Sequence, residues 1–147
     1  MEIAILGLGC FWGPEIKFSK LDGIIKTEVG YCGGNSSETT YKEVCTGTTN
    51  HAEVVKLDFD PKIISYEKIL KYFFEIHDPT TLNSQGPDFG TQYRSEIFCL
   101  NNRQKEISEK IIKEENIKFS GKVVTKTSLV KNYCPAEEYH QKYLEKR

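Results

Sequence analysis

The chain has 147 residues, and its 20 basic and 21 acidic residues leave a formal net charge of −1. This length suits one ordinary domain with a single core, so we expect one domain over residues 1–147. A charge this close to zero excludes a general electrostatic attraction to nucleic acid or to a membrane surface, and no apolar run approaches the roughly 18 residues that span a bilayer. We therefore expect a cytoplasmic protein with no nucleic-acid or membrane partner.

In the first half of the chain, the apolar run Ile3–Leu6 predicts a strand, and the amphipathic pattern that starts near Phe11 predicts a helix. We expect Asp22-Gly23 to end this helix. Alternating apolar residues over 25–31 and 53–59 predict two half-buried strands, with a long polar loop between them.

In the second half, apolar residues from Tyr66 to His77 recur at helical spacing after Ser65, which can cap the helix. A loop rich in polar residues and glycine follows over 78–94. The remaining expected elements are a strand over 96–100, a helix from Asn101 or Asn102 to about Ile117, and a strand over 122–130, before a polar and aromatic tail.

This order of elements predicts an α+β fold, a ferredoxin-like (split βαβ) plait in which helices pack on a mixed sheet. The two long loops contain tyrosines, glycines and acids, and loops of this length in a compact domain are commonly functional. We therefore expect them to contribute to the functional site.

Five cysteines stand at positions 10, 32, 45, 99 and 134, an odd number without a Cys-x-x-Cys pair. This pattern does not suit a secreted disulfide framework and indicates a reducing compartment. The three histidines form no pair on one helix face, so we expect no metal site.

Cys10 stands between the first strand and the first helix, in the run Gly9-Cys10-Phe11-Trp12-Gly13-Pro14-Glu15. The positive end of the helix is expected to favour the nucleophilic thiolate of Cys10. Phe11 and Trp12 can form the wall of a small apolar pocket, while Gly9 and Gly13 allow the backbone to approach a substrate closely.

Several chemistries of a reactive thiol do not fit the neighbouring residues. His51 could serve as the base of a cysteine protease, but no acid or amide stands out as its orienting partner. A cysteine phosphatase needs arginine at the position that Ile16 occupies, and a thioredoxin-like motif needs cysteine at Gly13.

An acid and hydroxyl groups remain as partners for Cys10. Burial would raise the pKa of Glu53 and make its carboxyl a proton donor near neutral pH. Tyr41 and Tyr93 could donate hydrogen bonds, and Asp88 precedes Tyr93 in the same loop. From spacing alone, Glu53 could equally be an exposed carboxylate at a strand edge and Tyr41 an ordinary packing residue.

Taken together, seven segments resemble the A-type peptide methionine sulfoxide reductases, in the order in which that family has them. The resemblance covers essentially the whole chain. The segments are Gly9–Glu15, Val29–Gly34, Thr40–Gly47, His51–Glu53, His77–Thr80, Gly90–Ser95 and Pro135–Gln141.

The resemblance implies reduction of methionine S-sulfoxide, free or in peptides and proteins, through a sulfenic acid on Cys10 and without a bound cofactor. It implies that a thiol such as thioredoxin, glutaredoxin with glutathione, or dithiothreitol then restores Cys10. By position, the resemblance implies that Cys10 attacks the sulfur of the sulfoxide while Phe11 and Trp12 hold its methyl group. Glu53 would donate a proton to the sulfoxide oxygen, and Tyr41 and Tyr93 would bind that oxygen. Asp88 would position substrate or water.

The cysteines depart from the family pattern. Many members carry resolving cysteines in a glycine-rich tail, whereas this sequence ends at Arg147. Cys134 replaces a usual aromatic residue and is the candidate resolving cysteine, although we favour direct reduction of Cys10 by an external thiol. Two other functions stay open from the residues alone, a binding module with an aromatic cage and a cysteine peroxidase.

Overall fold

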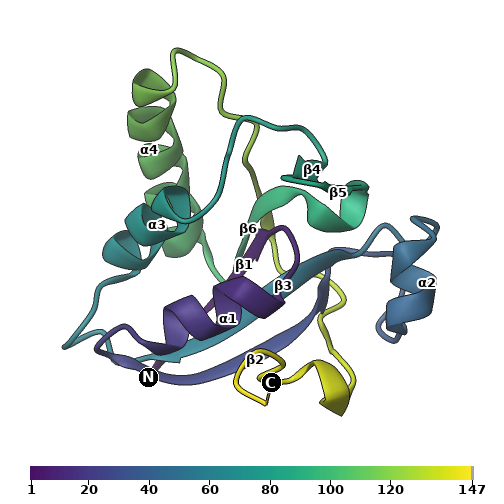
Figure 1. The fold of residues 1–147 in the computed structure, drawn as a ribbon. Coiled ribbons are helices and arrows are strands. Elements are labelled where there is room, and N and C mark those ends of the chain that lie inside the picture. Colours follow the sequence, from purple (N-terminus) through teal and green to yellow (C-terminus); the bar gives the residue numbers. More distant parts are fainter. Residues whose placement is uncertain (147) are drawn as a thin grey trace.

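The computed structural model describes residues 1–146, and a six-stranded sheet forms its centre (Figure 1). The strands run in the order β7-β6-β1-β3-β2-β8. Their bounds are β1 Glu2–Leu8, β2 Ile24–Cys32, β3 Ala52–Phe59, β6 Ser95–Cys99, β7 Lys126–Leu129 and β8 Cys134–Pro135. The helices are α1 Trp12–Ser19, α2 Tyr41–Cys45, α3 Tyr66–Glu75 and α4 Asn102–Lys118.

The four strands β6, β1, β3 and β2 pair antiparallel in this spatial order, which is the arrangement of a split βαβ plait. The crossover through α4 adds β7 parallel to β6, so the sheet is mixed. The predicted fold class, α+β with helices on a mixed sheet, is confirmed.

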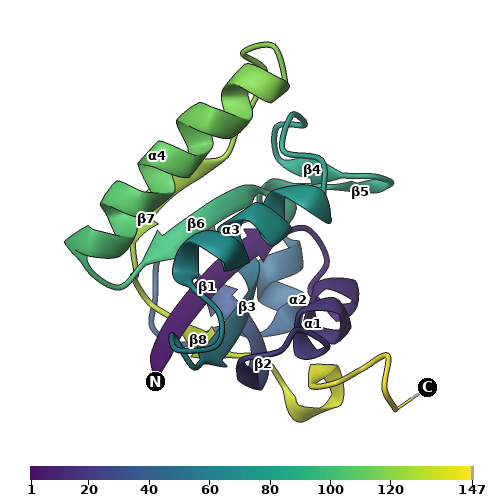
Figure 2. The same cartoon turned by 90° about the vertical axis from the view of Figure 1, so that its left-hand side faces the viewer.

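The two faces of the sheet are covered differently. The larger core cluster joins Phe18 of α1, Phe73 of α3 and Ile111 of α4 to strand residues such as Leu6 and Leu57. Figure 2 shows α3 and α4 lying along the same side of the sheet. On the opposite face a smaller cluster, which includes Phe98, is covered by Val130 and Tyr133 from the segment that crosses between β7 and β8.

The helix α3 follows its predicted pattern closely. The Ser65 side chain accepts a hydrogen bond from the backbone N–H of Lys68 at 3.0 Å and so caps the first turn. Ile69, Leu70, Phe73 and Phe74 are buried, as their spacing predicts. The helix ends at Glu75, and the His77 imidazole accordingly lies beyond it.

Several expected boundaries were wrong. The helix α1 ends at Ser19, before the expected Asp22-Gly23 stop. The last long strand, β7, spans Lys126–Leu129 only, since Val124 N donates instead to the Pro79 carbonyl at 2.8 Å.

The long loops contain short elements that the sequence analysis missed. One is α2, which Thr40 caps by accepting from Glu43 N at 3.2 Å. Others are the hairpin of β4 (Ser84–Gln85) and β5 (Asp88–Phe89) and two 3₁₀ turns, η1 (Thr91–Tyr93) and η2 (Glu138–His140). These elements bring the loop residues to the end of the sheet at which β1 leads into α1.

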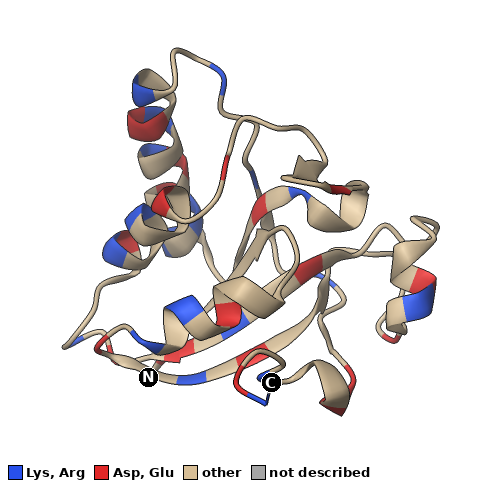
Figure 3. Cartoon of the chain, in the orientation of Figure 1, with Lys and Arg blue, Asp and Glu red and all other residues tan. Residues whose placement is uncertain are grey.

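Basic and acidic side chains are interspersed along α4 and over the other helices and strands (Figure 3). Within residues 1–146, no helix combines the length and apolar character needed to cross a membrane.

Candidate active site

The site forms where β1 passes into α1. Across the sheet Leu8 of β1 pairs with Ser95 of β6, and Glu53 of β3 pairs with Tyr31 of β2. Phe11 N donates a hydrogen bond to Glu53 Oε1 at 3.3 Å. This contact brings the Glu53 carboxyl beside the turn that holds Cys10.

The Glu53 side chain is buried, with 1% of the residue exposed. Its second carboxyl oxygen, Oε2, has no hydrogen-bond partner among the described residues. The pKa of Glu53 is raised to about 8, chiefly by burial; the Phe11 N–H opposes the rise, and the charge of Asp88 adds to it. The expected rise is confirmed, and Glu53 is not an exposed edge carboxylate. At neutral pH the carboxyl is mostly protonated.

The Cys10 thiol is half-buried and free. The pKa of Cys10 is raised to about 11, chiefly by burial and also by the charges of Glu53 and Asp88, while the Trp12 N–H lowers it. The N-terminus of the helix thus acts in the expected direction, but the expected net bias toward the thiolate is wrong for the free protein. One N–H at the start of α1 does not compensate for removing the sulfur from water, so Cys10 rests as a thiol.

The β4–β5 hairpin packs against the Cys10 turn. Gly9 has a φ of +97°, and a Cβ on it would lie 2.7 Å from the Gln85 side chain, so only glycine fits there. A Cβ on Gly13 would meet nothing within 4 Å, so packing inside the protein does not require glycine there. The hairpin also carries Asp88, whose charge acts on both Glu53 and Cys10.

Both candidate tyrosines face this group. Burial raises the pKa of Tyr41, and the neighbouring Cys45 side chain adds to the rise. Burial also raises the pKa of Tyr93 to about 12, and the charges of Glu53 and Cys10 add to the shift. The two phenols are therefore neutral at physiological pH and can donate hydrogen bonds.

Aromatic rings surround the first turn of α1. Phe11 is buried, and its ring centroid lies 5.8 Å from that of Tyr31. The Trp12 indole stacks on Tyr143 with centroids 3.9 Å apart, and its Nε1–H donates to His140 Nδ1 at 3.1 Å. The His140 ring also lies 4.5 Å from the ring of Tyr41. The arrangement offers an apolar wall beside the Cys10 thiol and the Glu53 acid.

The sequence analysis assigned no role to the residues that fix this wall. The Glu137 carboxylate accepts hydrogen bonds from Tyr31 Oη at 2.8 Å and from Tyr41 N at 2.9 Å. His140 fixes the Trp12 indole as described above. Both residues lie in Pro135–Gln141, a segment that the motif comparison had singled out, and this was the one signal that could have found them.

The chain after β8 is held to the site by buried polar contacts. Glu15 Oε1 accepts from Lys142 N at 2.7 Å, while its Oε2 accepts from Thr27 Oγ1 at 2.8 Å. The Gln141 amide bonds both the N–H and the carbonyl of Val29 at 2.9 Å. These contacts position His140 and Tyr143 against Trp12.

The comparisons with known proteins identify the family. A model described as peptide methionine sulfoxide reductase matches residues 2–147. The chain belongs to this family. It is 83% identical over its whole length to a relative from Pelagibacter ubique named peptide methionine sulfoxide reductase MsrA, and the match covers all of that protein.

Solved structures agree with this assignment. Reduced Mxr1 from Saccharomyces cerevisiae is 42% identical with a TM-score of 0.95, over 99% of this chain and 85% of that one. Mxr1 in complex with Trx2 is 28% identical with a TM-score of 0.70, over 97% and 84% of the two chains. The present chain is thus a peptide methionine sulfoxide reductase, an oxidoreductase that reduces methionine sulfoxide with a thiol as reductant.

His51 has a structural position in this reductase. The ring is buried, its Nε2 lies 2.9 Å from the Ser36 carbonyl, and a Cβ on Gly34 would collide with it. His51 therefore packs between two loops, which agrees with rejecting a cysteine-protease reading.

The other cysteines of the reductase lie in different settings. Cys32 and Cys99 are buried, whereas Cys45 is exposed at the end of α2. The Cys134 thiol lies 3.8 Å from the Thr39 carbonyl and 3.6 Å from that of Pro135. In the part of the chain that the structure describes, no group of three or more histidine, cysteine or acidic residues could hold a metal ion.

A substitution at Asp88 should change the titration of Glu53. Because the negative charge of Asp88 raises the Glu53 pKa, Asp88→Asn should lower the midpoint at which that carboxyl ionises. Carbon-13 NMR of the labelled carboxyl gives this midpoint directly. Asp22→Asn, at an exposed position after α1, is the matched control. An unchanged midpoint in Asp88→Asn would contradict the placement of Asp88 beside Glu53.

Proposed function

We propose that Cys10 attacks the sulfur of methionine S-sulfoxide, free or in oxidised proteins, while Glu53 protonates the departing oxygen. The observation that carries this proposal is the buried Glu53 carboxyl, which is mostly protonated at neutral pH and has one oxygen without a partner. A sulfoxide oxygen leaves poorly unless it is protonated, so an acid beside the thiol supplies what the reaction needs.

In the proposed reaction the Cys10 sulfur first bonds to the sulfoxide sulfur while Glu53 protonates the oxygen. The sulfur–oxygen bond of the substrate and the new sulfur–sulfur bond then break as the hydroxyl group bonds to the Cys10 sulfur, which leaves a sulfenic acid on Cys10 and releases methionine. Cys10 is oxidised by two electrons and the substrate is reduced by two. The Cys10 thiol loses its proton to solvent before the attack, and Glu53 recovers a proton from solvent after the turnover.

We assign the remaining substrate contacts to the aromatic wall and the phenols. Phe11 and Trp12 would hold the methyl group, Tyr41 and Tyr93 would donate hydrogen bonds to the oxygen, and Asp88 would position substrate or water. Fixing both the methyl group and the oxygen leaves the sulfur of only one epimer facing Cys10. This supports selectivity for one epimer, which we propose to be S.

For the return step we propose that an external thiol reduces the sulfenic acid of Cys10 directly. The complex of the yeast relative Mxr1 with Trx2 supports a thioredoxin-type reductant, and a glutaredoxin-type protein would supply the same chemistry. Cys134 is the alternative, an internal resolving cysteine. The free state of all five thiols is compatible with the cytoplasmic location that we propose.

The test is methionine formation by a small amount of protein in excess S-sulfoxide with dithiothreitol. We expect many methionine molecules per protein from the S epimer and negligible formation from the R epimer. Equal rates for the two epimers would contradict the stereochemical assignment. Binding without turnover would favour the aromatic-cage module, and faster oxidation of Cys10 by peroxide than by S-sulfoxide would favour a peroxidase.

A further inference from the structure

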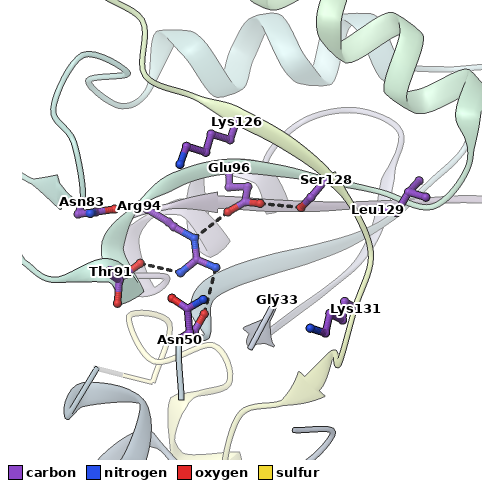
Figure 4. A pocket seen from close by; sticks show the side chains of 10 residues that line it. All are labelled: Gly33, Asn50, Asn83, Thr91, Arg94, Glu96, Lys126, Ser128, Leu129 and Lys131. Carbon is purple, nitrogen blue, oxygen red and sulfur yellow. Dashed lines mark hydrogen bonds and ion pairs between the residues drawn. The ribbon is translucent and has the colours of Figure 1, made fainter. Parts of the chain in front are cut away.

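A pocket of about 380 Å³ opens beside η1, which carries Tyr93, and the turn that leads into β3, the strand that carries Glu53 (Figure 4). Glu96 lies in this pocket and is two residues from Phe98, so both side chains belong to the sheet face opposite the main helices. The pocket therefore lies on the other side of the sheet from the Phe18 and Phe73 core. It is lined by Gly33, Asn50, Asn83, Thr91, Arg94, Glu96, Lys126, Ser128, Leu129 and Lys131.

A chain of polar contacts runs through this pocket and ends on Arg94. Ser128 Oγ of β7 donates to Glu96 Oε2 at 2.6 Å, and Glu96 Oε1 accepts from Arg94 Nε at 2.7 Å. Both charged side chains are largely withdrawn from water, with 14% of Arg94 and 10% of Glu96 exposed. Because this ion pair is largely buried and both partners make further hydrogen bonds, the guanidinium plane of Arg94 is fixed in one orientation.

The two other guanidinium nitrogens reach separate loops. Arg94 Nη1 donates to the Thr91 carbonyl at 2.9 Å, and Nη2 donates to the Asn50 carbonyl at 3.1 Å. Thr91 opens the turn that carries Tyr93, and Asn50 stands three residues before Glu53. Figure 4 shows both contacts diverging from the same guanidinium group. One side chain therefore links the turn that bears the phenol to the start of the strand that bears the acid.

The surroundings leave little freedom at this junction. Asn50 has a φ of +59°, in the left-handed region, so its carbonyl direction is set by an uncommon backbone conformation. A Cβ on Gly33, whose φ is +83°, would lie 3.1 Å from Arg94 Nη2. Lys126 and Lys131 line the same pocket, and no dashed contact in Figure 4 involves them.

We propose that Arg94, oriented by Glu96 and Ser128, is a positioning residue for the reduction step, because it fixes Tyr93 and Glu53 at one separation around the sulfoxide oxygen. This inference rests on the proposed function of those two residues. A change of this spacing by a fraction of a bond length should affect the chemical step more than substrate binding.

The test compares Arg94→Ala and Arg94→Lys with Lys126→Ala and Lys131→Ala. We expect both Arg94 variants to lose about 10²-fold in the single-turnover rate at saturating substrate, with a small change in KM, because lysine cannot contact Glu96 and both carbonyls together. Free guanidinium, added well below unfolding concentrations, should enter the open pocket and restore Arg94→Ala, whereas methylammonium should not. The two lysine variants should keep the wild-type rate.

A second measurement separates positioning from general damage to the fold. In a Tyr93→Phe background the phenol is already absent, so Arg94→Lys should cost much less than it does in the wild-type background. Three results would overturn the inference. They are a folded Arg94→Lys protein with the wild-type rate, a folded Arg94→Ala protein whose rate guanidinium does not restore, and an equal loss of rate from Arg94→Lys in both backgrounds. Loss of turnover in the wild type itself would instead overturn the proposed function.

Discussion

Cys10→Ser is expected to abolish methionine formation, even with excess dithiothreitol. The hydroxyl of serine has a far higher pKa than a thiol and is a much weaker nucleophile toward sulfur, and its oxygen cannot form the sulfenic acid that carries the two electrons. The substitution exchanges one half-buried atom, so the fold should be kept. Methionine measured by chromatography after overnight incubation should stay at the level of a sample without protein.

The matched controls are Cys45→Ser and Cys134→Ser. With dithiothreitol as the external thiol, both should form one methionine per protein as fast as the wild type in the first turnover, since neither thiol takes part in the attack. A first turnover that is lost in either control and kept in Cys10→Ser would contradict the assignment of Cys10 as the nucleophile.

Glu53→Gln is expected to slow the chemical step by about 10² to 10⁴-fold. The amide is close in shape to the carboxylic acid, and its oxygen can still accept from Phe11 N. What the variant lacks is a proton that can be transferred to the sulfoxide oxygen. Rapid-mixing single-turnover experiments at saturating substrate measure this step, and a loss below about tenfold would contradict the role of Glu53 as general acid.

The pH dependence gives a second test of Glu53. In the arrangement that reacts, Cys10 is a thiolate and Glu53 is protonated, so the pair holds one proton. Below a pH of about 8 the free protein holds two, one on the Cys10 thiol and one on the Glu53 carboxyl. At low substrate concentration the wild-type rate should therefore rise with pH up to about 8 and stay level until Cys10 ionises at a pH of about 11. In Glu53→Gln the limb near 8 should disappear. A wild-type rate that falls as pH rises through this midpoint would contradict the assignment.

The structural features that depend on residues close together in the chain could be predicted from the sequence. The order of the elements, the plait and the buried face of α3 follow from local periodicity and capping. The short helix α2 escaped prediction, although Thr40 and Glu43 form a capping pattern, because five residues are too few to show a helical period. The β4–β5 hairpin, with two residues in each strand, was missed for the same reason.

The electrostatics of the site could be predicted only in part. The raised pKa of Glu53 follows from its expected burial in a strand next to Cys10. The raised pKa of Cys10 depends on charges that reach it from β3 and from the β4–β5 hairpin, and on burial that outweighs the helix N-terminus. The contacts of Glu137 and His140 join residues about one hundred positions apart, which no local pattern indicates.

Mass spectrometry after one turnover without reductant tests the role of Cys10 most directly. The reductase is mixed with an excess of methionine S-sulfoxide in the presence of dimedone, digested and mapped. We expect one methionine released per protein and a dimedone adduct on Cys10, which marks a sulfenic acid there. A disulfide between Cys10 and Cys134 would replace direct recycling by internal resolution, whereas methionine release with an unmodified Cys10 would contradict the assignment of its thiol as the group that takes the oxygen.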